Sequence, residues 1–177
     1  MIQPLIRKTE MGDIDQIVSI AKHNELKDAY YKEIQTRGFL VSRFSEANYR
    51  NYVIDNEHFY VLEDRGVIRA FILIFKENEL DYKSIVNAKI KDYTQRNFIV
   101  VKQICVEAES RRKGYGRKLY EYIAKLIKQD ILAAIVLEPM NIASIEFHKK
   151  LGYTSEFKIT PEDGLTRGIF MLSNHQN

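Results

Sequence analysis

The chain has 177 residues, 45% of them hydrophobic and 29% charged, which is the balance of a globular domain rather than of a disordered chain. Its 27 basic and 24 acidic side chains leave a net charge of +3, too small to indicate nucleic-acid binding through overall charge. No apolar run approaches the roughly 20 residues of a membrane-spanning helix, so we expect one domain over residues 1–177 without a membrane segment.

The N-terminal third predicts one strand followed by helical pieces. Residues 2–9 form the strand and lack the basic and then apolar layout of a secretory signal. Asp13 then caps a helix, because apolar side chains recur behind it at helical spacing. Residues 24–56 are helical but broken, with an interruption at Gly38 and a second helical piece that opens at Ser45.

The middle of the chain predicts a hairpin, an insertion and a long strand. Residues 58–63 and 67–75 are two strands joined by a short glycine-containing turn. Residues 76–97 are polar with weak helical periodicity, and we interpret them as an insertion rather than a linker between domains. Residues 98–106 are apolar and β-branched and resume the sheet. They contain Cys105, the only cysteine, which excludes an internal disulfide and indicates a buried, inert thiol in a reducing cytoplasm.

The last third predicts helices that alternate with strands. A helix runs to about Gln129, a short buried strand covers residues 133–137, and Asn141 caps a second helix. The last two strands cover residues 153–159 and 166–172. The predicted fold is α/β, with a mixed sheet of about six to seven strands and about four flanking helices. The sheet is mostly antiparallel, with a parallel fourth and fifth strand.

The turn between the strand at residues 98–106 and the following helix is the strongest chemical signal in the chain. A glycine-bearing turn at this point exposes main-chain N–H groups beside the positive end of a helix dipole, and its glycines let a ligand come close. It therefore suits an anion, above all a phosphate. Positive charge also gathers here, and it opposes the helix dipole unless an anion binds. The cations are Arg111, Arg112, Lys113, Arg117 and Lys118.

Two motifs in this order resemble the GNAT superfamily of N-acetyltransferases. The first family signature, [Arg/Gln]-x-x-Gly-x-[Gly/Ala] after the fourth strand, is matched by Arg111, Gly114 and Gly116. The second is an Asn at the start of a helix that leads to Lys-x-Gly-[Phe/Tyr], and residues 141–153 match it. Either motif alone is a modest signal, but the two together are specific. The resemblance implies the family's acyl-CoA N-acyltransferase fold and an acetyltransferase activity.

By this resemblance acetyl-CoA is the co-substrate, and no metal takes part. The pyrophosphate would lie on the glycine turn, with Arg111 structural or beside it. An extended pantetheine arm would pair with the main chain of Ile104 and Val106 as a strand does, and Asn141 would lie near that arm. The residues whose N–H groups are implied in pyrophosphate binding are Arg112, Lys113, Gly114, Tyr115, Gly116 and Arg117.

The implied reaction is direct transfer of the acetyl group from the thioester to a primary amine of a small molecule or a protein. The amine must first lose a proton, since an ammonium of pKa near 10.4 has no lone pair. The departing thiolate needs a proton donor, for which the family usually has a Tyr at the position of His148. His148 is therefore a candidate acid, and the alternative is that it only packs.

Glu107 is the candidate base, because it follows the fourth strand near the expected thioester. The alternative is an exposed, solvated strand end, and Glu63 is a second candidate base. The acceptor pocket is expected from the least regular parts of the chain, residues 24–56 and 76–97, which contain no motif that names an acceptor.

Two other interpretations stay open. The first is a catalytically inactive acyl-CoA-binding or regulatory module, which would have the same fold without turnover. The absence of the family's Tyr leaves this alternative open. A nucleic-acid-binding protein that uses the cations of the turn predicts steep salt dependence, and the balanced charge argues against it. We therefore expect acetyl-CoA and an amine as partners, without nucleic acid or membrane. The oligomeric state is open, a homodimer being one option.

Overall fold

The computed structural model describes residues 3–26 and 35–174 of the chain. Its α-helices and strands, in chain order, are β1 (Leu5–Lys8), α1 (Ile14–Asn24), α3 (Glu46–Asp55), β2 (Phe59–Asp64), β3 (Val67–Lys76), α4 (Ile85–Tyr93), β4 (Phe98–Val106), α5 (Tyr115–Leu126), β5 (Asp130–Val136), α6 (Ile142–Lys150), β6 (Thr154–Ile159) and β7 (Arg167–Leu172). Among the described residues, no helix has the length and apolar character needed to cross a membrane.

The strands form a mixed sheet in the order β1-β2-β3-β4-β5-β7-β6. The β4 and β5 strands are parallel, and their register runs from Phe98↔Asp130 to Val101↔Ala133. The pairs β1–β2, β2–β3, β5–β7 and β6–β7 are antiparallel. The predicted mixed sheet with a parallel fourth and fifth strand is therefore confirmed.

The chain divides into two compact units, which are described separately. The first unit comprises residues 1–25, 40–74 and 102–126, and the second comprises residues 26–39, 75–101 and 127–177. The β4 strand belongs to both, with residues 98–101 in the second unit and residues 102–106 in the first. The expectation of one domain over the whole chain stays a prediction.

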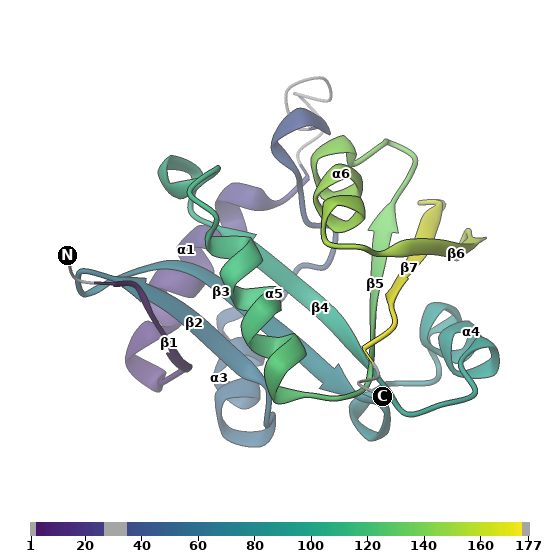
Figure 1. The fold of residues 1–177 in the computed structure, drawn as a ribbon, viewed down its shortest axis with the longest axis horizontal. Helices are drawn as coiled ribbons and strands as arrows, with labels where there is room; N and C mark the ends of the chain where they lie inside the picture. The colour runs from purple at the N-terminus through teal and green to yellow at the C-terminus, as the bar shows by residue number, and fades with distance from the viewer. Residues whose placement is uncertain (1–2, 27–34, 175–177) are drawn as a thin grey trace. The chain divides into compact units, whose positions relative to one another are not determined.

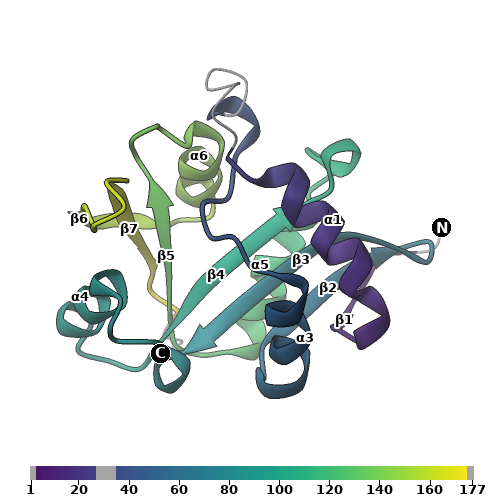
Figure 2. The ribbon, with the colours of Figure 1, turned by 180° about the vertical axis from the view of Figure 1, so that it is seen from behind.

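In the first unit, helices lie on both faces of the strands β1, β2 and β3. Figure 1 shows α5 in front of these strands, and the reverse view in Figure 2 shows α1 and α3 on the other face. Leu119 and Ile123 of α5 are fully buried, as are Ile14 and Ile17 of α1. Because each helix buries one apolar face, the helical spacing that the sequence predicts is also the spacing that fixes each helix on the sheet.

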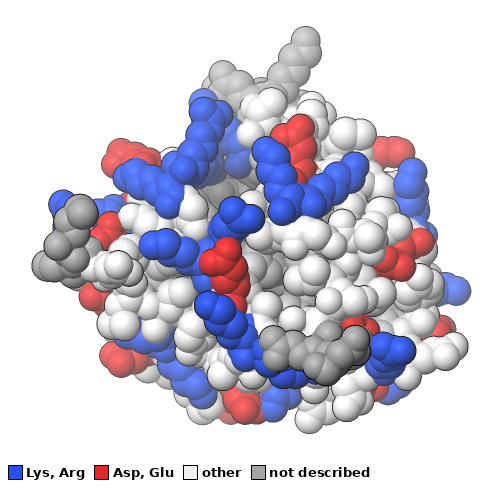
Figure 3. Space-filling view, in the orientation of Figure 1, with Lys and Arg blue, Asp and Glu red and all other residues white. Residues whose placement is uncertain are grey.

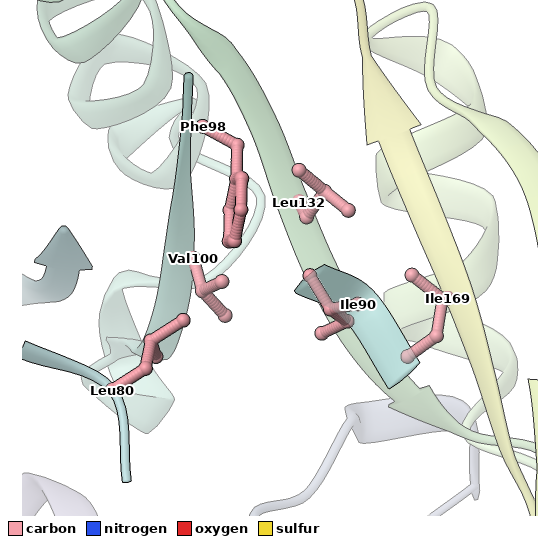
Figure 4. Packing of buried hydrophobic residues seen from close by; sticks show 6 residues of the cluster. All are labelled: Leu80, Ile90, Phe98, Val100, Leu132 and Ile169. Carbon is pink, nitrogen blue, oxygen red and sulfur yellow. The ribbon is translucent and has the colours of Figure 1, made fainter. Parts of the chain in front are cut away.

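The core of the second unit is an apolar cluster that joins α4 to strands β4, β5 and β7. Figure 4 shows its buried members, which are Leu80, Ile90, Phe98, Val100, Leu132 and Ile169. Ile90 is fully buried and comes from α4. The weak helical periodicity of residues 76–97 therefore marks a real helix, and this helix is part of the core of its unit.

The structure adjusts several predicted boundaries. α5 ends at Leu126, before Gln129, and β5 begins at Asp130, ahead of the predicted start at residue 133. Asp130 is buried although it is charged, so hydropathy alone does not mark it as part of a strand. Ser45 caps α3 as expected, because its side chain accepts a hydrogen bond from the N–H of Asn48 at 3.2 Å. Residue 2 of the predicted first strand and residues 27–34 lie outside the described residues.

Candidate active site

The turn before α5 has two residues in the left-handed region of backbone conformation. Arg112 has φ +62° and Gly114 has φ +81°. A Cβ built on Gly114 meets no heavy atom within 4 Å, so the space beside this residue is open. Left-handed residues in a turn direct successive N–H groups toward one side, which creates a concave site for an anion. The turn thus combines two left-handed residues with open space beside Gly114, and the phosphate site stays a prediction.

The N–H groups of this turn are available to a ligand. The N–H of Arg111 donates to the Ala108 carbonyl at 3.4 Å, and in the described part of the chain the next residue whose N–H donates to a main-chain carbonyl outside the helix is Lys118, which bonds to Gly114 at 3.0 Å. The N–H groups ahead of it lie at the positive end of the helix dipole. The side chains of Arg112, Lys113 and Arg117 are exposed around them. Figure 3 shows Lys and Arg (blue) over the face that carries α5. This combination favours an anion.

Two side chains anchor the turn to the rest of the first unit. Tyr115 is buried, and its hydroxyl donates to Asp64 Oδ2 at 2.7 Å, which ties the start of α5 to the β2–β3 hairpin. This hydrogen bond raises the pKa of Tyr115. Arg111 Nη2 donates to Asn24 Oδ1 at 2.8 Å, at the end of α1. Of the two roles left open for Arg111, this contact supports the structural one.

Ile104 and Val106 follow the part of β4 that pairs with β5. The described register between these strands ends at Val101↔Ala133. Gln103 and Cys105 are buried, whereas Ile104 and Val106 are half-buried, as alternation along a strand requires. The pKa of the buried Cys105 thiol is raised by burial, which supports the inert role expected for it. Ile104 and Val106 thus have main-chain groups beyond the β5 register.

Glu107 lies directly after β4 and is held by two donors. Its Oε2 accepts hydrogen bonds from Arg69 Nη1 at 2.6 Å and from the Ser110 hydroxyl at 2.7 Å. Partial burial raises the pKa of Glu107, but the bonds from Ser110 and Arg69 outweigh it, and the net pKa is below its ordinary value. The side chain is therefore a carboxylate at neutral pH, in a fixed position rather than in free solvent.

His148 lies on α6 in the second unit and is 2% exposed. Its Nδ1 lies 2.7 Å from the Ser144 carbonyl, which assigns the ring proton to Nδ1. Burial lowers the pKa of His148 to about 4, although the bond to Ser144 opposes this shift. The ring packs edge-on against Phe147 and Tyr153. His148 is therefore a neutral, packed side chain at neutral pH.

Asn141 caps α6 as predicted and also binds a distant segment of its unit. It is 4% exposed, and its Oδ1 accepts from the Ser144 N–H at 3.3 Å. Its Nδ2 donates to the Phe39 carbonyl at 2.9 Å. The neighbouring Gly38 has φ +81°, and a Cβ built there would lie 3.6 Å from Asn141 Oδ1. Asn141 thus fixes the start of α6 and the segment around Phe39.

Comparison with known proteins decides the family. A model described as the acetyltransferase (GNAT) family matches residues 23–153, about three-quarters of the chain. The chain belongs to the GNAT acetyltransferase family. It is accordingly an acyltransferase, and the resemblance stated from the two sequence motifs is confirmed.

Solved structures of GNAT proteins share the fold over nearly the whole chain. Ard1 from Thermoplasma volcanium has 17% identity and a TM-score of 0.69, with 97% of each chain covered. YncA from Salmonella typhimurium, solved with its cofactor acetyl-CoA, has 19% identity and a TM-score of 0.67, with 99% of this chain and 96% of that chain covered. PaiA N-acetyltransferase from Thermoplasma acidophilum, in complex with coenzyme A, has 13% identity and a TM-score of 0.66, with 96% and 98% covered. No curated protein sequence matches the chain.

Sequence reasoning missed the residues that hold the GNAT turn in place. Asn24 lies 87 positions from Arg111, and Asp64 lies 51 positions from Tyr115. Arg69 lies 38 positions from Glu107. None belongs to a motif, and an Asn at the end of a helix reads only as a helix stop. Within residues 3–26 and 35–174, no cluster of three or more His, Cys, Asp and Glu side chains is placed to hold a metal ion.

Proposed function

We propose that this GNAT acetyltransferase takes the acetyl group of acetyl-CoA and transfers it directly to a primary amine of a small molecule or a protein. The observation that carries the proposal is the turn at residues 111–116, where exposed cations surround main-chain N–H groups at the start of α5. YncA and PaiA, which share the fold, were solved with acetyl-CoA and coenzyme A, and this supports the same donor here.

Donor binding is proposed at three places. The pyrophosphate binds the N–H groups from Arg112 to Arg117, and the exposed cations neutralise its charge. The amides of the pantetheine arm pair with the main chain of Ile104 and Val106, beyond the register with β5. Asn141 is proposed as a further donor-binding residue from its sequence motif, and within its own unit its amide is bonded to Phe39 and Ser144.

Glu107 is proposed as the base that receives the amine proton. Both of its described hydrogen bonds go to Oε2, so among the described contacts Oε1 is left for the substrate. Its lowered pKa makes it a weak base, so it first orients the ammonium by accepting a hydrogen bond and then receives that proton as the amine becomes the neutral nucleophile. Glu107→Gln should lower kcat while the affinity for CoA stays within about twofold. Equal turnover of this variant and the wild type would leave Glu107 as a structural ion pair with Arg69.

His148 has two proposed roles, and one variant separates them. As the acid for the departing thiolate, it would have to donate from a ring that is neutral and bonded to Ser144. As a packing residue, it would only stabilise α6 against Tyr153. His148→Phe keeps a ring of similar size and removes both nitrogens. Lower turnover with unchanged CoA affinity supports the acid, and unchanged turnover supports packing.

The direct test combines donor binding with an acceptor panel. Calorimetry with CoA should detect binding, and acetyl-CoA with a panel of small amines and peptides should release free thiol with at least one acceptor. No binding of CoA contradicts the proposed function. Binding without turnover on any amine supports the alternative, an inactive acyl-CoA-binding module. The observation that favours this alternative is His148, which is buried and neutral at the position where the family usually has a Tyr. Sedimentation of the same samples decides between a monomer and a homodimer.

A further inference from the structure

The last residue of α1, Asn24, is a buried polar residue that connects three segments of the first unit. It is 9% exposed. Its Nδ2 donates to the Ile20 carbonyl at 2.8 Å and to the Val106 carbonyl at 3.4 Å. Its Oδ1 accepts from Arg111 Nη2 at 2.8 Å. Two of these partners lie in the region where donor binding is proposed, although Asn24 itself belongs to neither family motif.

The contact with Val106 lies on a defined side of β4. The N–H of Glu107 donates to the Arg69 carbonyl of β3 at 2.8 Å. In a trans peptide the carbonyl points away from the following N–H, so the Val106 carbonyl points away from β3. This is the side of the strand end on which the pantetheine arm is proposed to pair. The carboxamide of Asn24 therefore stands beside the main-chain group that would recognise the arm.

The contact with Arg111 fixes the other end of the proposed donor site. Arg111 is the first residue of the glycine turn. Its half-buried side chain bonds to Asn24, whereas the side chains of the other cations in the turn are exposed. The main chain of Asn24 is held in turn, because its carbonyl accepts from the Leu40 N–H at 2.7 Å. The bond to Ile20 lies within α1, whereas the bonds to Val106 and Arg111 join other segments and therefore go beyond termination of the helix.

We propose that Asn24 is a positioning residue for the acyl donor. It acts through Arg111 on the pyrophosphate turn and through Val106 on the edge of β4, so that both parts keep one arrangement before the donor arrives. The inference rests on the proposed function, because it assumes that these two segments bind CoA.

A double-mutant cycle on CoA affinity tests this role. Asn24→Leu removes both polar groups at similar volume, and Arg111→Met removes the guanidinium while keeping an unbranched side chain. Each single variant should weaken CoA binding about tenfold, and the double variant should be no more than about twofold weaker than the worse single variant. Arg111→Lys keeps a donor that can reach Asn24, and it should retain more affinity than Arg111→Met.

The control is Asn87→Leu, because Asn87 is also a buried asparagine that binds a carbonyl, that of Asp81 at 2.8 Å. Asn87→Leu should leave CoA affinity within about twofold of the wild type. It should change the urea midpoint by about as much as Asn24→Leu does. If Asn24→Leu does not fold, Asn24→Asp replaces it, since it keeps the acceptor for Arg111 and places an oxygen against two carbonyls. Asn24→Asp should weaken CoA binding about tenfold as well.

The outcomes separate the two proposals. If the wild type does not bind CoA, the proposed function fails. If the wild type binds CoA and Asn24→Leu, or Asn24→Asp in its place, behaves like Asn87→Leu, the positioning role is overturned. The role is also overturned if the losses from the two single variants multiply in the double variant, because Asn24 and Arg111 would then act independently.

Discussion

At the scale of single residues, Gly114 shows how closely the backbone and the charge of the site are linked. Its φ of +81° is a conformation that other L-residues adopt with strain, and Asn and Asp tolerate it best. The open space beside it means that a side chain added there would enter the proposed phosphate site without a clash. The residue can therefore report on the ligand separately from the fold.

Gly114→Asp and Gly114→Asn form a matched pair. Both carry the same backbone strain, but only Asp places a carboxylate where phosphate is proposed. We expect Asp to weaken CoA binding at least about tenfold more than Asn, measured by calorimetry. Gly164→Asp is the control, since Gly164 also has a positive φ of +74° and open space. Equal affinity of the Asp and Asn variants would contradict phosphate binding at this turn.

His148 gives a pH dependence of stability whose sign follows from its burial. Its pKa in the folded protein is about 4, below the ordinary 6.5, so the unfolded chain binds a proton first as the pH falls. Stability is therefore fully present above about pH 6.5 and is lost as the pH falls toward 4, by at most about 1.4 kcal/mol per pH unit.

Urea unfolding at pH 7, 6 and 5 checks this expectation. In His148→Phe the same carboxylates titrate, but the histidine no longer contributes, so the free energy of unfolding should fall less steeply between pH 6.5 and 5 than in the wild type. Parallel pH profiles for the two proteins would show that His148 is not held neutral by burial in the folded state.

At the scale of elements, local caps and apolar faces decide where helices begin and how they pack. α3 is the clearest case, because its amphipathic pattern is weak and its start depends on polar contacts. Ser45 and Asn48 bond reciprocally: the Ser45 hydroxyl accepts from the Asn48 N–H, and Asn48 Oδ1 accepts from the Ser45 N–H at 2.8 Å. Tyr49, one residue later, is 1% exposed and donates to Gln103 Oε1 at 2.7 Å. The cap thus fixes the turn that places Tyr49 in the core.

Ser45→Ala should lower the free energy of unfolding by about 1 kcal/mol, because one N–H at the start of α3 loses its acceptor. Ser45→Thr keeps a hydroxyl at the same position and should lose at most a few tenths of that amount. Urea denaturation followed by circular dichroism measures both. Equal losses in the two variants would mean that the hydroxyl does not stabilise the helix.

At the scale of the whole molecule, each of the two compact units has its own apolar core, and β4 runs through both. A strand shared in this way gives the units a common main-chain element. If the chain is a single domain, the two units should unfold together in one cooperative transition.

We expect a single urea transition, with coincident midpoints by far-ultraviolet circular dichroism and by tyrosine fluorescence. Saturation with CoA at about 100 times its Kd should raise the free energy of unfolding by about 2.7 kcal/mol for both probes. Adenosine at the same concentration is the control, because it lacks the pyrophosphate and the pantetheine arm. Two separate midpoints, or a CoA effect on one transition only, would contradict one cooperative domain.

Local sequence patterns are enough to predict the order of the helices and strands, the parallel pair of strands and the caps at Ser45 and Asn141. These features depend on patterns that repeat over two to four residues or on short motifs, so they are visible without a fold. Hydropathy alone misplaces a boundary where an acidic residue is buried, as at Asp130 at the start of β5. Residues 76–97 showed the same limit, since only packing against the sheet explains the helix there.

The distant side chains that hold the site become visible only in the folded chain. The bond from Arg111 to Asn24, the bond from Tyr115 to Asp64 and the ion pair of Arg69 with Glu107 each join residues far apart in the chain. The neutral state of His148 also follows from burial, which no single position in the sequence reveals. The physical reason is that a side-chain hydrogen bond or a desolvated ring depends on what packs beside it, and packing is fixed only when the elements meet.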